Sequence, residues 1–147
     1  MSRILELVAR ARQTGDYAEF TREVPYARWL GISALSRDGE IVGRLEFREH
    51  LIGNPVIPAL HGGTIGALLE STAIFRVLLD QETSLLPKTI NLTVAFLRSA
   101  RPADVWAHAT ITKQGRRVAS VRVEAWQEDR ARPIATASVH LLIKPLE

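Results

Sequence analysis

The sequence predicts an α+β fold in which a curved antiparallel sheet of five to six strands wraps around one long central helix. Two observations support this prediction. After the turn at His61-Gly62-Gly63, the chain as far as Asp80 is apolar at helical spacing, and a helix that is apolar on nearly all sides is normally buried. From Thr89 onward, four strand-like segments are joined by short turns, which favour antiparallel pairing. Such a sheet is long enough to curl around the helix.

The length and composition are typical of a single soluble domain. The chain has 147 residues, of which 46% are hydrophobic and 24% are charged. It contains no cysteine, which excludes disulfides, thiolate metal sites and a cysteine nucleophile. Glu6 and Arg10 interrupt the first apolar stretch, so no signal peptide is predicted, and no apolar run is long enough for a membrane span. We therefore expect a cytoplasmic protein without a membrane partner.

The basic residues are mostly arginine, and the formal net charge is +3 with a sequence pI near 9.8. An arginine-rich chain suits a phosphate-bearing ligand, and a compositional habit of the source genome is the alternative explanation. The basic residues are scattered, with one dense pair at Arg116-Arg117. Because no zinc-finger or RNA-binding signature accompanies this pair, no nucleic-acid partner is expected.

Residues 1–30 are predicted to form a helical extension that acts as a lid or brace over the main fold. Residues 2–13 have an amphipathic helical pattern, and residues 17–24 form a second short helical piece. Pro25 interrupts this pattern. Three side chains of the following segment are expected to pack against the fold: Tyr26, Trp29 and Leu30.

The hydrophobic pattern changes to a period of two after Gly31. Residues 32–35 are predicted as a first strand, and residues 41–47 as a half-buried second strand. The segment 50–60 contains Gly, Asn and two Pro residues, so it is predicted to be a loop before the central helix.

A polar connection over residues 81–88 is predicted to follow the central helix, and the final four strands come after it. In the first of them, residues 89–98, four alternate apolar side chains are expected on one face: Ile90, Leu92, Val94 and Phe96. The other strands are predicted at residues 105–113, 118–127 and 134–143, with a hairpin turn at Gln114-Gly115.

The His61-Gly62-Gly63 turn is a candidate anion site. Two glycines at a helix start let the backbone approach a ligand, and the free amides of the first turn favour negative charge. An oxyanion formed from a carbonyl group would suit this position. The alternative is an ordinary glycine-rich turn beside a packed histidine.

Glu70 is the candidate reacting group, because an acid on an apolar helix is costly to bury unless it is paired or used. It lies eight residues after Gly62, which is about 12 Å along a helix. A catalytic base must come within about 3 Å of the reacting atom, so one reaction can use both groups only if they come from two subunits. The alternative is a partly exposed acid at the edge of the helix.

The sequence offers no metal site. None of its four histidines lies four residues from another on a helix, and there is no HExxH, EF-hand or phosphate-loop pattern. His108 and His140 fall inside predicted strands, where surface or packing roles are expected. No cofactor is predicted.

Two segments together resemble a known family. HGGTIGALLESTA, at residues 61–73, resembles the HGG-x4/5-L-x-[DE] segment of hotdog-fold acyl-CoA thioesterases, the phenylacetate-pathway type in particular. The resemblance continues through residues 88–143, with a strand that ends in FLRSARPAD, then another strand, a KQGRR hairpin and two more strands. It covers about residues 25–143.

This resemblance implies a hotdog fold and a dimer with a continuous sheet, which in the family often pairs into a tetramer. It also implies hydrolysis of an acyl-CoA thioester at the subunit interface. The amide of Gly62 would polarise the carbonyl, and Glu70 would act as nucleophile or as base for water. The remaining catalytic residues implied by the family are His61 of the same motif, Thr89, whose hydroxyl would hold the water, and Asn54, which would position the nucleophile or the water.

The resemblance also implies substrate contacts at Gly63 and, for the CoA phosphates, at Arg98, Arg116 and Arg117. The chain departs from the family in three ways. Many relatives have Asp where this chain has Glu70. A thioesterase branch with Glu has an assisting Thr where this chain has Ile74. Asn54 is one residue farther from His61 than the common spacing.

The leading hypothesis is therefore an acyl-CoA thioesterase that needs no cofactor. The first alternative is a hotdog module that binds acyl-CoA without hydrolysing it. The second is a dehydratase of the same fold, whose usual Asp/His pair is not evident in this sequence. The sequence does not specify the acyl group.

Overall fold

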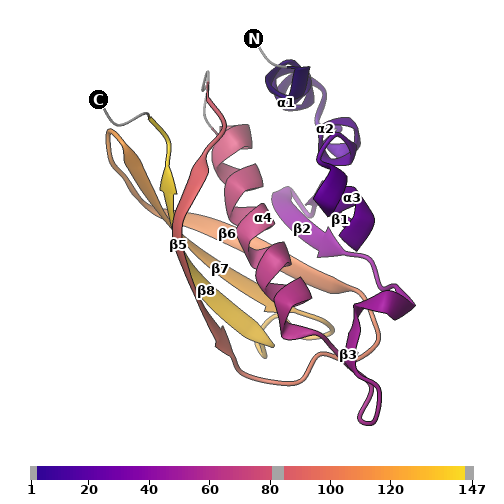
Figure 1. The fold of residues 1–147 in the computed structure, drawn as a ribbon. Coiled ribbons are helices and arrows are strands. Elements are labelled where there is room, and N and C mark those ends of the chain that lie inside the picture. Colours follow the sequence, from indigo (N-terminus) through magenta and orange to yellow (C-terminus); the bar gives the residue numbers. More distant parts are fainter. Residues whose placement is uncertain (1–2, 81–84, 145–147) are drawn as a thin grey trace.

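The structure, a computed structural model, describes residues 3–80 and 85–144. It confirms the predicted α+β class: a six-stranded antiparallel sheet curves around a long central helix, as in a hotdog fold (Figure 1). The strand order in the sheet is β1-β2-β6-β7-β8-β5, and β3 pairs with β4 in a separate two-stranded ribbon. The first half of the predicted connection at residues 81–88, residues 81–84, lies outside the described residues.

The elements follow the predicted order. The helices are α1 (Arg3–Thr14), α2 (Ala18–Arg22), α3 (Pro25–Leu30) and α4 (Gly62–Asp80), with a 3-10 turn η1 (Glu49–Leu51). The strands of the main sheet are β1 (Ile32–Arg37), β2 (Glu40–Leu45), β5 (Lys88–Phe96), β6 (Val105–Gln114), β7 (Val118–Trp126) and β8 (Ala135–Leu142). The ribbon consists of β3 (Ile52–Asn54) and β4 (Ala59–Leu60).

The core lies between α4 and the concave face of the sheet. Helix α4 buries nine side chains, including Leu68, Leu69 and Phe75, against strands β2, β6 and β7. The length and hydropathy of α4 would also suit a membrane span, but half of its apolar window is buried inside the fold. The apolar composition of α4 is therefore explained by its packing in the core.

One stripe of α4 is only half-buried, which corrects the expectation of a helix covered on nearly all sides. The stripe follows helical spacing and consists of Gly66, Ala67, Glu70, Ser71 and Ile74. Its first members are small, and a Cβ added at Gly66 would meet no atom within 4 Å. This side of α4 is therefore open in the single chain.

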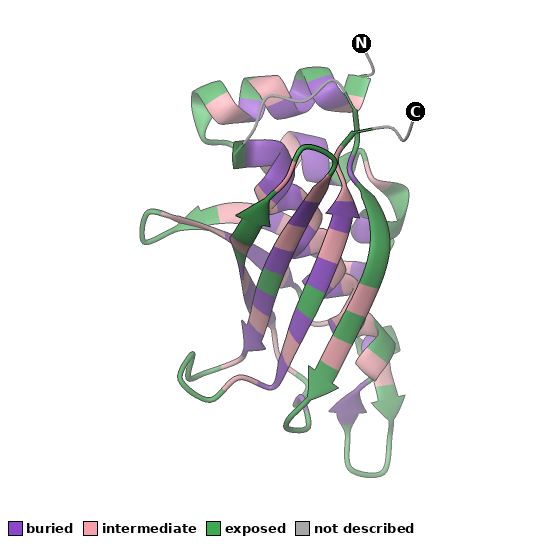
Figure 2. Ribbon diagram, turned by 90° about the vertical axis from the view of Figure 1, so that its left-hand side faces the viewer, coloured by how far each residue is buried: buried purple, intermediate pink, exposed green. Residues whose placement is uncertain are grey.

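Strand β5 forms an exposed edge of the sheet. It pairs with β8 on one side and has no partner strand on the other among the described residues. Most of its residues are exposed, whereas the neighbouring strands alternate between buried and accessible residues (Figure 2). Ile90, Phe96 and Leu97 are more than half exposed. An edge that combines free backbone groups with apolar side chains is normally covered by another strand.

A bulge in β5 changes the predicted alternation of side chains. Thr89 pairs with Leu141 and Asn91 pairs with His140, so Ile90 is an extra residue in the strand. The prediction that Leu92, Val94 and Phe96 share one face is confirmed, because their partners Val139, Ala137 and Ala135 are all buried residues of β8. The bulge leaves Ile90 without a partner residue, so its place on that face stays a prediction. Because Leu141 is fully buried, its partner Thr89 lies on the helix side of the sheet.

The N-terminal helices cover one end of the core, as the predicted brace would. Phe20 of α2 packs edge-to-face on Phe75 of α4, and the Arg12 guanidinium donates to the carbonyl of Leu78 near the end of α4. Two predicted packing groups are exposed instead: Tyr26 and Trp29 stack on each other at the surface. Leu30 alone of the three is buried, because the helical turn of α3 directs it inward.

The predicted loop at residues 50–60 is instead a short 3-10 turn followed by the β3–β4 ribbon. Leu51 accepts a hydrogen bond from the His61 N–H at 2.8 Å, which ties the ribbon to the start of α4. A Cβ added at Gly53 would lie 2.7 Å from the Cα of His61, so this close approach of two backbones requires glycine. The ribbon therefore fixes the position of the His61 turn.

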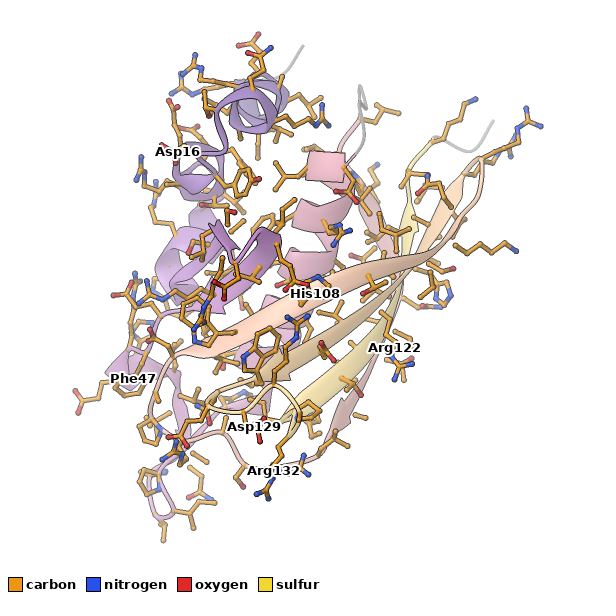
Figure 3. All side chains as sticks on the ribbon, turned by 180° about the vertical axis from the view of Figure 1, so that it is seen from behind. Asp16, Phe47, His108, Arg122, Asp129 and Arg132 are labelled. Carbon is orange, nitrogen blue, oxygen red and sulfur yellow. The ribbon has the colours of Figure 1, made fainter. Side chains whose placement is uncertain are left out.

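The convex face of the sheet is polar. His108 and Arg122 project from this face, away from α4 (Figure 3). Burial lowers the pKa of His108, and the carboxylate of Glu40, 3.6 Å away, opposes that shift. His140 shares a 2.7 Å hydrogen bond with Asn91. Both histidines thus make local contacts on the sheet, in agreement with the packing roles expected for them.

Replacing Asp104 with Ala is expected to lower the free energy of unfolding by about 1–3 kcal/mol, because it removes a partly buried charged hydrogen-bonding centre. The carboxylate accepts from the Phe47 N–H at 2.7 Å and from the Arg44 guanidinium at 2.7 and 3.1 Å. Chemical denaturation provides the measurement. Glu128→Ala, which breaks only the exposed pair with Arg101, is the control, with an expected loss below about 1 kcal/mol.

The cost of Asp104→Ala should also depend on pH. Burial alone would raise the pKa of Asp104, but the hydrogen bonds from Phe47 and Arg44 outweigh burial and hold that pKa below its ordinary value. The stabilisation is then present above the unfolded pKa of about 4 and is lost as the pH falls from there through the folded pKa. An equal difference from the wild type at pH 7 and well below pH 4 would contradict this assignment.

Candidate active site

His61 caps the start of helix α4. Its Nδ1 accepts the N–H of Gly63 at 2.8 Å, and its carbonyl accepts both the N–H of Thr64, at 3.0 Å, and the Thr64 hydroxyl, at 2.6 Å. An Nδ1 that accepts places the ring proton of a neutral imidazole on Nε2. The imidazole thus satisfies one of the orphan amides of the helix start, as an N-cap side chain does.

This cap leaves the amide of Gly62 as the available donor of the turn. Among the described residues, no acceptor contacts the Gly62 N–H, whereas the Gly63 N–H is engaged by His61. The predicted role of Gly62 as donor to a carbonyl therefore fits its geometry. The predicted substrate contact of Gly63 does not fit its amide in this conformation.

A cavity of about 380 Å³ opens beside Gly62. Its walls come from the β4–α4 junction, the end of β5 and the loop that follows β5. A Cβ added at Gly62 would lie 3.2 Å from the Phe96 ring, so the glycine leaves room for this wall. The lining residues include Ile65, Phe96, Arg98, Ser99 and Ala100.

Glu70 lies on the half-buried stripe of α4, two turns after Gly62. Its carboxylate has no hydrogen-bond or ion-pair partner among the described residues. The sequence suggested a buried acid, but the observed position matches the alternative, a partly exposed acid at a helix edge. Such a group keeps its acceptor capacity for a ligand or a water, and it lies about 12 Å along α4 from the free amide of Gly62.

Asn54 has a local structural contact. Its Oδ1 accepts the N–H of Val56 at 3.0 Å and lies 3.5 Å from the N–H of Ile57, which closes the tip of the β3–β4 ribbon. The side-chain oxygen is therefore committed to this turn. The geometry of the single chain gives no support for the predicted role of Asn54 in positioning a nucleophile.

The other predicted site residues lie at opposite ends of β5. Arg98 lines the Gly62 cavity and donates to the carbonyl of Pro133 at 2.6 Å. Thr89 is the second residue of β5, near the other end of α4. Arg116 and Arg117 line a separate depression at the β6–β7 hairpin, which adjoins the start of β5 through β8. Within one chain, Gly62 and Arg98 therefore line the same cavity, whereas Thr89 and the Arg116-Arg117 pair lie elsewhere.

Sequence reasoning missed one feature of the site. Phe96 was assigned only to a strand face, although its ring forms the wall beside Gly62. Ser99, which shares with Arg98 the turn expected to contact the CoA phosphates, lines the same cavity. The FLRS segment, which contains both residues, lies at the end of the strand predicted to start at Thr89. Because the helix and this strand run antiparallel, the end of the strand could have been placed beside the start of the helix.

The chemistry available to these residues is that of an amide donor and a carboxylate. An N–H at a helix start stabilises a developing oxyanion, and a carboxylate takes a proton or attacks an acyl carbon. Within the described ranges 3–80 and 85–144, no three His, Asp or Glu side chains are grouped as metal ligands. The residues present therefore fit hydrolysis of an activated carbonyl compound.

Comparisons with known proteins point the same way. A sequence model of the thioesterase superfamily matches residues 58–134. The medium/long-chain acyl-CoA thioesterase YigI of Salmonella typhimurium is 28% identical, and the match covers 88% of this chain and 92% of that protein.

Similar proteins are also found among the solved structures. A protein of Chromobacterium violaceum is 36% identical with a TM-score of 0.77, and the match covers 97% of this chain and 99% of that one. A phenylacetic acid degradation-related protein of Ralstonia eutropha JMP134 is 25% identical with a TM-score of 0.74, over 93% and 99% of the two chains. The chain, with its curved sheet, its central helix and its HGG turn, belongs to the thioesterase superfamily.

Proposed function

We propose that the protein hydrolyses an acyl-CoA thioester to the free acid and CoA, at a site that two subunits share. The observation that carries this proposal is the separation, by about 12 Å of helix, of an amide at Gly62 and a carboxylate at Glu70 that both lack a partner among the described residues. The relationship to an acyl-CoA thioesterase over most of the chain supports acyl-CoA as the substrate class.

A two-fold axis solves the problem of distance. Two antiparallel α4 helices that meet at Gly66, midway between Gly62 and Glu70, would bring the amide of each subunit to the carboxylate of the other. The open side of α4 suits such a contact, because Gly66 and Ala67 let two helices approach closely.

The same axis accounts for the exposed edge strand. Phe96 of β5 lies beside Gly62 of α4. Gly66 is about 6 Å farther along the helix, and about two strand residues span the same distance, so Val94 is the residue of β5 level with Gly66. Pairing of β5 with its copy around Val94 would cover Phe96 and extend the sheet across both subunits. It would also place Thr89 of the partner subunit near Ser99, at the cavity beside Gly62.

The reaction then needs only these groups. The carbonyl oxygen of the thioester accepts the Gly62 N–H, and Glu70 of the partner subunit takes a proton from a water as the water oxygen bonds to the acyl carbon. The carbon–sulfur bond then breaks, and the departing thiolate takes the proton from the Glu70 carboxyl. Direct attack by the carboxylate, followed by hydrolysis of the resulting anhydride, uses the same two groups.

The same symmetry brings two groups of basic side chains toward each other. Reversal of β5 would carry the Arg116-Arg117 hairpin of the partner subunit toward Arg98. Guanidinium groups match the geometry of phosphate oxygens, so these side chains suit the phosphates of CoA.

Release of thiol from a panel of acyl-CoA esters tests the proposed activity. Turnover of at least one ester, abolished by Glu70→Gln, is the expected result. Measurable binding of CoA esters without any thiol release would instead identify the chain as a binding module.

Replacing Gly66 with Leu is expected to convert the dimer to a monomer and abolish hydrolysis. In the single chain the new side chain has open space, and removal of a mid-helix glycine favours the helix by about 0.5–1 kcal/mol, so the monomer should stay folded. Light scattering and circular dichroism measure both effects. Glu6→Leu places the same side chain on an exposed position of α1 and should leave the dimer intact. A Gly66→Leu protein that remains dimeric and active would contradict the proposed interface.

A further inference from the structure

An apolar depression lies at the end of the molecule opposite the His61 turn. Helix α1 contributes Leu5, the segment before β5 contributes Leu86, and the end of β8 contributes Leu142 and Ile143. Leu85 and the exposed residues Lys88 and Lys144 complete the described lining. Leu86 is a large apolar side chain that is 43% exposed.

The wall formed by α1 is held in place by contacts of its own. Arg12 donates through Nε to the Leu78 carbonyl at 3.0 Å, near the end of α4. Leu5, Leu7, Val8 and Ala11 are buried on the face of α1 that turns toward the fold. The depression is therefore bounded by helix α1 of the N-terminal extension. This helix has no other role in the proposed hydrolysis.

We infer that this depression holds the distal part of the acyl chain of the substrate, so that α1 and Leu86 determine acyl-chain length. The inference rests on the shared site proposed above. Pairing of β5 around Val94 would set Phe96 of one subunit opposite Leu92 of the partner subunit, so the end of one β5 would lie beside the start of the other. Because Phe96 lines the Gly62 cavity and Lys88, at the start of β5, lines the depression, this pairing would bring the two hollows next to each other across the interface.

The apolar depression on the helix side of the sheet suits an acyl chain, whereas the depression on the other side suits the polar groups of CoA. The depression contains Leu5 and so faces the helix side of the sheet, and apart from its two lysines its described lining is aliphatic. The neighbouring depression at Arg116 and Arg117 contains Ser120, whose strand neighbours Ala119 and Val121 are buried, so it faces the other side. Amides and phosphates of CoA need the polar side, whereas methylene groups gain free energy on the apolar side.

Binding of thioether analogues of acyl-CoA, with chains from two to sixteen carbons, tests this inference without requiring turnover. In the wild type, each added methylene is expected to tighten binding by roughly two- to fourfold until the depression is filled. Leu86→Trp should end this gain at a shorter chain and leave the affinity for the shortest analogue unchanged. Leu86→Ala should extend the gain to longer chains.

Two further variants complete the experiment. Leu5→Phe narrows the depression from α1 and should shorten the preferred chain even if Leu86→Trp fails to fold or to dimerise. Thr110→Trp adds the same ring to an exposed position of β6, outside the depression, and should not change the profile. Wild-type chain-length profiles in folded, dimeric Leu86→Trp and Leu5→Phe proteins would overturn the inference. Shortened profiles in a protein that hydrolyses no ester would refute the proposed function and leave this inference standing.

Discussion

Glu70→Gln is expected to lower kcat for the best acyl-CoA ester by about 10³-fold while the protein stays folded and dimeric. The amide has nearly the shape of the carboxylate but neither takes a proton from water nor attacks an acyl carbon, and general-base catalysis contributes about 10²–10⁴-fold. Because Glu70 has no ion-pair partner among the described residues, its replacement leaves no buried charge without a counterpart. Steady-state thiol release gives kcat, and thermal unfolding gives the stability.

Glu6→Gln is the matched control for this substitution. Glu6 lies on the exposed face of α1, so the same change of charge there should leave kcat within about twofold of the wild type. Wild-type turnover by the Glu70→Gln protein would remove Glu70 from the reaction and, with it, the proposed mechanism.

Gly62→Pro is expected to lower kcat by about 10²–10³-fold, the usual cost of losing one oxyanion donor. Proline removes the N–H, and it is well tolerated at the first position of a helix, which Gly62 occupies. The ring would approach Phe96, whose side chain is 60% exposed and therefore free to move. Unfolding curves should consequently stay close to those of the wild type.

Gly62→Ala separates the loss of the amide from crowding. Alanine keeps the N–H and places its Cβ at the same 3.2 Å from the Phe96 ring. We expect this variant to retain most of the turnover that Gly62→Pro loses. If both variants lose turnover equally, the available space at Gly62 matters and its N–H does not.

Much of the fold could be predicted because the patterns involved are local. The helical spacing after Gly63 and the alternation in β6 and β7 depend on which side chains face the core, and the structure buries alternate residues of both strands, among them Val105, Ala107, Val121 and Val123. The bulge at Ile90 could not be predicted, since a bulge depends on the register of β5 against β8. Because the bulge shifts the alternation of side chains, the sequence did not reveal on which side of the sheet Thr89 lies.

The site was predicted less completely than the fold because its residues act through tertiary contacts. The sequence placed Gly62 and Glu70 on one helix and fixed their spacing, which is a local property. It did not reveal that His61 occupies the amide of Gly63, or that Asn54 closes its own turn. Each of these side chains has several possible partners in sequence, and only the folded backbone selects one.

Mixing two inactive proteins tests the shared site most directly. Glu70→Gln and Gly62→Pro chains are unfolded together, refolded in equal amounts and assayed for thiol release, with native mass spectrometry to count mixed dimers. A mixed dimer combines Gly62 of one chain with Glu70 of the other in one intact site, so random pairing should restore about a quarter of the wild-type activity per chain. Mixed dimers that are as inactive as the two parents would contradict a site built from two subunits.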